Sequence, residues 1–224
     1  MAQRNKLGLE TKRKLVNIAK DLFFNKGYND ISLVKICKEA NVSRASFFYY
    51  FSGKAAIATF IADKVNYELV KKIRSRFSEE SYSETVYSVI VMMIFYRSIL
   101  SNNKVLRFFT ETMSDGSINN IAMRNFQISL EKLSKNAPIK LSETEFNMLV
   151  ISQMAMAPSL LLQYLVGKLD LSRDDFVNYL ITTAFLRLGY DSKVTNECLK
   201  QAQDAIGDYY VNLEEIFLAP MAGE

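Results

Sequence analysis

The chain contains no histidine and no tryptophan, and it has only two cysteines among its 224 residues. Without histidine, Ser–His and Cys–His nucleophile pairs and histidine metal sites are excluded. Cys37 and Cys198 lie far apart in the sequence, so they indicate neither a zinc site nor a disulfide framework. No phosphate-cradling glycine loop is present. We therefore expect no catalytic residue, no metal site and no cofactor, although the sequence cannot show two carboxylates converging in a cleft.

Residues that break helices are also scarce, with 8 glycines and 3 prolines in the whole chain. No alternating strand pattern, internal repeat or low-complexity linker is present, and this composition is typical of an all-α fold. The length suffices for one small module followed by a larger helical core. Beyond the N-terminal region, apolar periodicity predicts helices over residues 54–77, 82–101, 104–113, 118–135, 142–167, 172–189 and 193–218.

The N-terminal region begins with an amphipathic helix. Gly27 is placed to end it, because helix C-termini commonly require a left-handed residue that glycine adopts without steric cost. The apolar residues of this helix recur at the spacing of a core-facing side; they are Leu15, Ile18, Ala19, Leu22 and Phe23.

Residues 31–54 predict two short helices joined by a tight turn. Ser32 and Ser43 are suited to cap these helices through their hydroxyl groups. Asn41 lies in the turn, where a left-handed backbone is expected, and asparagine tolerates that conformation better than most residues. The arrangement is a helix-turn-helix, in which the second helix enters the major groove of duplex DNA. Its buried side is expected to contain Phe47, Tyr50 and Phe51.

The opposite face of this second helix carries residue types that read bases. The small residues Ala45 and Ser46 let the helix N-terminus approach base edges, and Arg44 can reach guanine acceptors or a phosphate. The ring of Phe48 can meet a thymine methyl group. The stretch 43–50 is therefore the expected recognition helix.

Three further residues suit the DNA backbone. The hydroxyl groups of Tyr49 and Tyr50 can donate to phosphate oxygens. Lys54 is expected to begin the next helix, whose positive N-terminal end also attracts phosphate. The alternative is a small three-helix core with ordinary solvated polar residues. Any one of these residues fits that alternative, but their joint order and spacing do not.

Residues 10–57, roughly a fifth of the chain, resemble the N-terminal domain of the TetR-type transcriptional regulators. The matching features are LFFNKGY at the end of the first helix, Ser32 with Ile36, the turn 40–43, and the aromatic block 47–51 followed by Lys54. The resemblance implies a homodimer that binds a near-palindromic DNA operator and releases it when a small molecule enters the C-terminal domain. By the family pattern, the positions that face DNA are Ser32, Arg44, Ala45, Ser46, Phe48, Tyr49, Tyr50 and Lys54.

Four positions depart from that pattern. Asn41 and Ala45 stand where glycine is common, and Ala45 is expected to crowd the backbone slightly at the groove floor. Phe48 stands where tyrosine is frequent, so one phosphate hydrogen bond is absent, and Tyr49 replaces a common histidine. These changes keep the binding mode but leave the operator sequence open.

The charge is distributed unevenly along the chain. Residues 1–60 contain 11 Lys and Arg against 4 Asp and Glu, a net of +7, which leaves a net of −3 for residues 61–224. A basic N-terminal part on a mildly acidic remainder is typical of a DNA-binding module joined to a body that does not bind DNA. Together with what the resemblance implies, this charge distribution predicts a DNA-binding domain at 1–55 and a helical effector-binding and dimerisation domain at 56–224.

Residues 146–167 carry no formal charge over 22 positions, which raises the possibility of a membrane span. Polar residues such as Gln153 interrupt the run, and Pro158 lies within it. A helix buried in the body and against a partner subunit is the better interpretation. The basic N-terminus lacks the apolar region of a signal peptide, so we expect a cytoplasmic protein with no membrane contact.

In the resembled family, the two helices that follow the ligand-binding core form a four-helix dimer interface with their twofold mates. Here these helices would be 142–167 and 172–189. Dimerisation would place two recognition helices about one DNA turn apart, ~34–36 Å. The sequence does not assign a role to the extra terminal helix at 193–218.

The effector is expected to be apolar or amphipathic. Nine methionines and fifteen phenylalanines are available to line an adaptable pocket, and residues 85–96 are uncharged. Ordinary core packing is the alternative for each of them. The candidate lining residues are Met92, Phe95, Phe109, Met113, Phe126 and Met154. Polar candidates near this stretch are Arg97, Arg107, Glu111 and Arg124.

Two hypotheses follow. The first is a ligand-responsive dimeric transcriptional regulator, with repression expected, in which helix 54–77 links the body to the DNA-binding domain. An activator with the same DNA contacts is indistinguishable from it by sequence. The second is a helical small-molecule-binding protein with weak or non-specific DNA contact. A specific operator preference separates the two.

Overall fold

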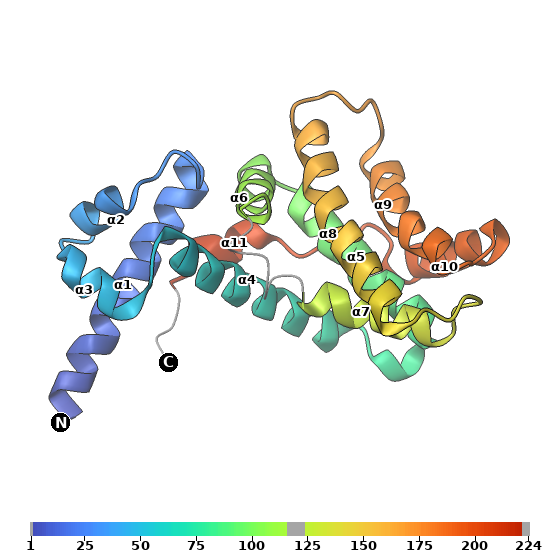
Figure 1. Ribbon diagram of the computed structural model, residues 1–224, viewed down its shortest axis with the longest axis horizontal. Helices are drawn as coiled ribbons and strands as arrows, with labels where there is room; N and C mark the ends of the chain where they lie inside the picture. The colour runs from blue at the N-terminus through green and yellow to red at the C-terminus, as the bar shows by residue number, and fades with distance from the viewer. Residues whose placement is uncertain (1, 116–123, 221–224) are drawn as a thin grey trace.

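A computed structural model describes residues 2–115 and 124–220 (Figure 1). The regular structure in these residues is entirely helical, so the predicted all-α fold is confirmed. The elements are α1 (Ala2–Lys26), α2 (Leu33–Glu39), α3 (Arg44–Tyr50), α4 (Lys54–Arg76), the short 3₁₀ helix η1 (Glu79–Ser81), α5 (Glu84–Leu100), α6 (Asn103–Met113), α7 (Arg124–Lys135), α8 (Glu143–Leu165), α9 (Arg173–Arg187), α10 (Ser192–Ile206) and α11 (Leu213–Leu218).

Helices α1, α2 and α3 form a small head at one end of the molecule (Figure 1). Local signals set their limits as predicted: α1 ends before Gly27, which has φ 91°, and Asn41 takes φ 49° in the turn between α2 and α3. Ser32 and Ser43 both cap their helices by accepting a hydrogen bond from a backbone amide. The helix-turn-helix prediction is therefore confirmed.

Helix α4 runs from the head into the larger body, which comprises α5 to α11 (Figure 1). Its buried side chains recur every four residues at Ile57, Ile61, Val65, Leu69 and Ile73. This spacing is that of a single apolar stripe, so the helix packs along one side while its other side remains accessible. Helix α4 contacts α1 of the head and α5, α6 and α11 of the body.

Helix α5 forms the centre of the body and packs against α4, α6, α7, α9 and α10. Because neighbours surround it, apolar residues occur around its whole circumference and 12 of its positions are buried. Arg97 is also buried there, and its charge is balanced by Asp174, whose carboxylate lies 3.0 Å from the guanidinium. Gln203 and the carbonyl oxygen of Gly207 accept its remaining hydrogen bonds.

Helix α8 is long and apolar enough to cross a membrane, and the pair α5–α6 passes the same test jointly although it is bent by 111°. Only 33% of the apolar window of α8 is buried within the single chain. On its inner side, Gln153 is buried and exchanges hydrogen bonds with Thr183 of α9. The inner side is thus an ordinary packed helix contact, and the outer side is uncovered in one chain.

Most predicted helices match the observed ones within the fraying expected at helix ends, namely those at 54–77, 82–101, 104–113, 142–167 and 172–189. Of the predicted helix 118–135, residues 118–123 lie outside the described residues. The predicted single helix at 193–218 is wrong. It divides at Gly207, where φ is 54° and the chain reverses out of α10 before α11 begins.

Candidate DNA-binding face and ligand hollow

The candidate recognition helix α3 begins with a double hydrogen bond at its N-terminus. The Oγ of Ser43 accepts from the backbone amide of Ser46 at 3.1 Å and donates to the Oγ of Ser46 at 2.9 Å. This cap satisfies one of the free amides of the first turn and fixes the start of a seven-residue helix. Both hydroxyl groups remain on the exposed side of the helix.

The two sides of α3 differ sharply in burial. Phe47 is fully buried, whereas Phe48 is 56% exposed and Tyr49 is 82% exposed. The smaller residues Ala45 and Ser46 beside them are exposed as well. Arg44 is also exposed at the first position of the helix. The exposed side therefore combines a cation, a hydroxyl group and two aromatic rings, which together suit phosphates and base edges.

The remaining predicted DNA-facing residues lie at the rim of this side. Ser32 is exposed and caps α2 by accepting from the amide of Lys35 at 3.2 Å, so its hydroxyl hydrogen stays available. Tyr50 is half-buried, and its hydroxyl lies beside Gly8 of α1. It therefore contributes to packing within the head as well as to the rim.

Lys54 has an intramolecular partner. Its ammonium group donates to the carbonyl oxygen of Tyr28 at 3.0 Å and lies 4.0 Å from the centroid of the Tyr28 ring. The residue does begin α4, as predicted, but its side chain folds back onto the end of α1. A phosphate contact by this ammonium would compete with Tyr28, whereas the α4 amide groups at its N-terminus are unaffected.

The head is attached to α6 by polar contacts. The hydroxyl of Tyr28 donates to Asp115 at 2.6 Å, and the amide of Asn29 donates to Glu111 at 2.8 Å. Arg107 donates to the carbonyl oxygen of Phe24 at 3.3 Å. Burial, together with the hydrogen bond and the negative charge of Asp115, raises the pKa of Tyr28, so this tyrosine remains a neutral donor.

Arg107 and Glu111 were named as polar candidates near the expected effector site, but these contacts place them against the head. Arg97 is buried against α9 and α10, so none of the three lines the hollow described below. The side chain of Arg124 lies outside the described residues. The sequence spacing on α6 could not show which side of that helix faces the head.

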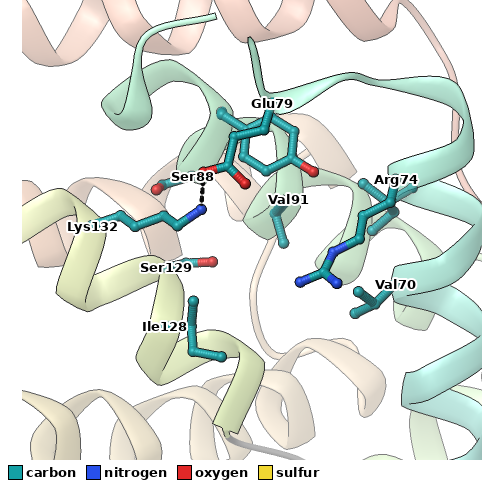
Figure 2. A pocket seen from close by; sticks show the side chains of 10 residues that line it. Val70, Arg74, Glu79, Ser88, Val91, Ile128, Ser129 and Lys132 are labelled. Carbon is teal, nitrogen blue, oxygen red and sulfur yellow. Dashed lines mark hydrogen bonds and ion pairs between the residues drawn. The ribbon is translucent and has the colours of Figure 1, made fainter.

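A hollow lies between α4, α5 and α7. It consists of two small adjoining lobes, with cavity volumes of about 30 Å³ and about 10 Å³, which are partly open to solvent and share Val70, Ile73, Val91 and Ser129. We call the whole the α4–α7 hollow. The inner lobe is mainly apolar, and the outer lobe has a charged rim (Figure 2).

Three of the six predicted effector residues line the inner lobe, namely Met92, Phe95 and Phe126. Phe109 and Met113 are buried, and Met154 is partly buried against the core, but none of these three lines the hollow. The sequence reasoning also missed the contribution of α4, whose lining residues are Asn66, Leu69, Val70, Ile73 and Arg74. Leu69 and Ile73 belong to the buried apolar stripe of α4, so the sequence contained no signal that distinguishes lining the hollow from ordinary packing.

The rim of the outer lobe contains an ion pair between Lys132 of α7 and Glu79 of η1 (Figure 2). The ammonium of Lys132 also lies 5.5 Å from the centroid of the Tyr87 ring. Burial and the charge of Glu79 raise the pKa of Tyr87, while Arg74 opposes the shift. Within the described residues, no three His, Cys, Asp or Glu side chains gather as a metal site would require.

Comparison with known proteins identifies the N-terminal part of the chain. Residues 15–59 match the family described as bacterial regulatory proteins, tetR family. No curated protein matches the sequence.

Several solved structures share the fold over nearly their whole length. RolR without ligand is 12% identical, with a TM-score of 0.57 over 84% of this chain and 95% of that one. A tetR-family transcriptional regulator from Streptomyces coelicolor is 16% identical, with a TM-score of 0.52 over 92% and 94%. The TetR family protein CprB from S. coelicolor is 14% identical, with a TM-score of 0.50 over 88% and 97%. At these identities the likeness shows the fold.

Proposed function

We propose that this chain, a TetR-family transcriptional regulator, is a ligand-responsive dimeric repressor that binds a near-palindromic operator through the recognition helix 43–50. The observation that carries the proposal is the exposed side of α3. Tyr49 is 82% exposed and Phe48 is 56% exposed on a helix whose opposite side carries the fully buried Phe47. The rings of Phe48 and Tyr49 meet Phe47 and Tyr50 edge-on, yet both remain exposed beside a cation and hydroxyl groups, and such a surface suits a DNA groove.

We assign the DNA-facing positions as Ser32, Arg44, Ala45, Ser46, Phe48, Tyr49, Tyr50 and Lys54. Arg44, Ala45, Ser46 and Phe48 are the proposed base readers, and the hydroxyl groups of Ser32, Tyr49 and Tyr50 are the proposed phosphate donors. The proposed division between the DNA-binding domain and the body falls after residue 55, in the first turn of α4. Because α4 continues without interruption, the two parts are linked by a rigid helix.

We propose that α8 and α9 form the dimer interface. Both helices expose large apolar side chains in the single chain, and burying such a surface in a partner avoids aggregation. The exposed residues are Met148, Ile151 and Leu162 on α8, and Tyr179 and Leu186 on α9. A dimer joined there would carry two heads, as a two-half-site operator requires. A buried helical interface also accounts for the apolar α8 in a cytoplasmic protein.

The effector would enter the α4–α7 hollow. Helix α4 lines this hollow along Asn66 to Arg74 and begins at the head, so a ligand that moves α4 would also change the spacing of the two heads. A switch of this kind requires that the ligand bind the two arrangements with different affinity. The apolar inner lobe supports an effector with an apolar part.

Selection from a random duplex library at fixed near-physiological salt tests the proposal. Recovery of a palindrome with two half-sites about one DNA turn, ~34–36 Å, apart is the expected result. Recovery of no motif, with general salt-sensitive binding only, would overturn the proposal in favour of a ligand-binding protein with weak DNA contact. Fixed salt is essential because phosphate contacts make every affinity salt-dependent.

A further inference from the structure

Residues 207–220 run from the centre of the body back to the head, and we call this segment the C-terminal strap. It begins where Gly207 takes φ 54° and turns the chain out of α10, and it contains the short helix α11. Helix α11 lies beside α1 and α4 and contacts both (Figure 1). The strap is thus a connection between body and head that is separate from α4.

The body end of the strap is anchored on α5. The buried guanidinium of Arg97 donates to the carbonyl oxygen of Gly207 at 2.6 Å. The amide of Val211 donates to the buried hydroxyl of Ser98 at 2.9 Å, and Leu213 is fully buried. Breaking these enclosed hydrogen bonds would leave buried polar groups without partners, so the body end is expected to stay fixed to α5.

The head end rests on α1 through one ring and one charged hydrogen bond. Phe217 is buried and stacks on Phe24. Lys20 is only 4% exposed, and its ammonium donates to the carbonyl oxygen of Ala219. On release of this end, water can replace the carbonyl oxygen as acceptor, so the main cost is the lost burial of the ring. The head end is therefore the more easily detached of the two.

Helix α1 transmits this contact to the recognition helix. Leu15, Ala19 and Phe23 of α1 are fully buried in the core. Helix α1 packs against α2, which packs against α3. Contacts of α6 restrain the chain just after the end of α1, and the strap restrains α1 near Lys20. Because attachment at two separate points resists a rotation that one point allows, the strap limits rotation of the head about α4.

From these contacts we infer that the C-terminal strap fixes the angle of the head on the body and thereby sets the half-site spacing that the dimer accepts. The inference rests on the proposed function, since it concerns how the same DNA-binding face is positioned. Two recognition helices held at fixed positions reach successive major grooves at one spacing. Heads released from the strap tolerate a changed spacing, but they bind every operator less tightly because they are less pre-organised.

Affinity for the selected operator, and for a version with one extra base pair between the half-sites, tests the inference. The extra base pair moves one half-site by about 3.4 Å and turns it by about 35° around the DNA axis. The parent chain is expected to bind the altered operator about tenfold more weakly. In Phe217→Ala this ratio is expected to fall to about threefold or less.

Two further variants complete the comparison. Lys20→Met removes the other head contact while its apolar stem stays in place, so it carries the test if Phe217→Ala does not remain folded in thermal unfolding. Its spacing ratio is expected to fall in the same direction. Leu218→Ala is the matched control, because it shortens an exposed side chain of the same helix and should keep the ratio of the parent chain.

A distance measurement that needs no DNA accompanies the binding assay. Nitroxide labels on ketone-bearing residues at the exposed positions Glu39 of α2 and Lys193 of α10 report the head-to-body distance by pulsed electron resonance. Dilution with unlabelled chains keeps the measurement within one chain. Phe217→Ala or Lys20→Met is expected to broaden the distance distribution about twofold, as release of a hinge does. Leu218→Ala should leave it unchanged.

The inference is overturned if the parent chain binds both spacings equally, or if neither head-end variant lowers the ratio or broadens the distance distribution. A palindrome recovered by the parent chain, with one ratio shared by all variants, keeps the proposed function and removes the role of the strap. If no palindrome is recovered, the proposed function fails, and the half-site spacing fails with it. The distance measurement then still decides whether the strap holds the head.

Discussion

The ring of Phe217 stacks on the ring of Phe24, with centroids 5.3 Å apart and an angle of 23° between the planes. Phe24 lies in the last turn of α1, and Phe217 lies in α11 near the opposite end of the sequence. Phe108 of α6 meets Phe217 edge-on at 5.0 Å. Lys20 also donates to the carbonyl oxygen of Ala219. The C-terminal segment thus packs against both the head and the body, next to α4 (Figure 1).

Phe217→Ala is expected to destabilise the chain by about 3–5 kcal/mol, because it empties a fully enclosed site between three helices. Urea denaturation measures the loss. Leu218→Ala is the control, since the neighbouring side chain is 62% exposed, and its effect should stay within about 0.5 kcal/mol. Similar small losses of unfolding free energy in both variants would mean that the packing of α11 against the head does not stabilise the chain.

Arg44→Ala is expected to change base preference, with a cost of about 1–3 kcal/mol at one operator position. The physical reason is the loss of a bidentate contact at the exposed N-terminus of α3. Selection of the operator with the variant measures the change. Lys200→Ala, on the exposed side of α10, should select the same operator as the parent chain. An unaltered preference in Arg44→Ala would remove this residue from the base readers.

Lys54→Ala is expected to weaken binding to all sequences and to reduce the salt slope by about one unit, as loss of one phosphate contact does. The prediction requires the ammonium to leave Tyr28, over whose ring it lies at 4.0 Å. DNA affinity measured across a salt series distinguishes a phosphate contact of Lys54 from its contact with Tyr28. A variant with lower thermal stability and an unchanged slope would show that Lys54 serves the Tyr28 contact alone.

Ile151→Glu is expected to convert the proposed dimer into a monomer, because it places a charge on the apolar outer side of α8, where this residue is 65% exposed. Sedimentation equilibrium gives the mass. Val194→Glu on α10, where the side chain is 39% exposed, should remain dimeric. A dimer that survives Ile151→Glu would place the interface elsewhere.

Asp63→Asn is expected to stabilise the chain at pH 8 and to have no effect near pH 4. Burial raises the pKa of the Asp63 carboxyl to about 6, and its Oδ1 is buried without a hydrogen bond. The folded state therefore holds a proton that the unfolded state releases above about pH 4. The stability contributed by this proton is present at low pH and is lost as the pH rises through 6.

The expected gain at pH 8 is about 1–2 kcal/mol, below the full value of the pKa shift because the group is partly solvated. Thermal unfolding at the two pH values measures it. Asp170→Asn, at an exposed loop position, should change neither midpoint. A stabilisation that is equal at both pH values would contradict the titration of Asp63.

Features governed by neighbouring residues could be predicted from the sequence. A serine hydroxyl reaches an amide three residues ahead, so the caps at Ser32 and Ser43 follow from local spacing. The left-handed turn at Asn41 and the glycine at the end of α1 are equally local. The break at Gly207 was missed because apolar periodicity resumes in α11 and conceals a six-residue interruption that one glycine begins.

The pairing of elements distant in the sequence could not be predicted in this way. Arg107 and Glu111 were expected near the effector, yet they meet the head, because the crossing of α6 over α1 decides which side of α6 faces outward. The same applies to Arg74, which enters the hollow only because α4 passes beside α5 and α7.

By itself, the sequence determined the all-α fold and the helix-turn-helix, since caps, turn residues and apolar spacing act over a few residues. Tertiary structure alone decided that an apolar hollow lies between α4, α5 and α7, and that Phe217 returns to Phe24. These contacts join segments tens to nearly two hundred residues apart, and their geometry depends on how whole helices cross and pack.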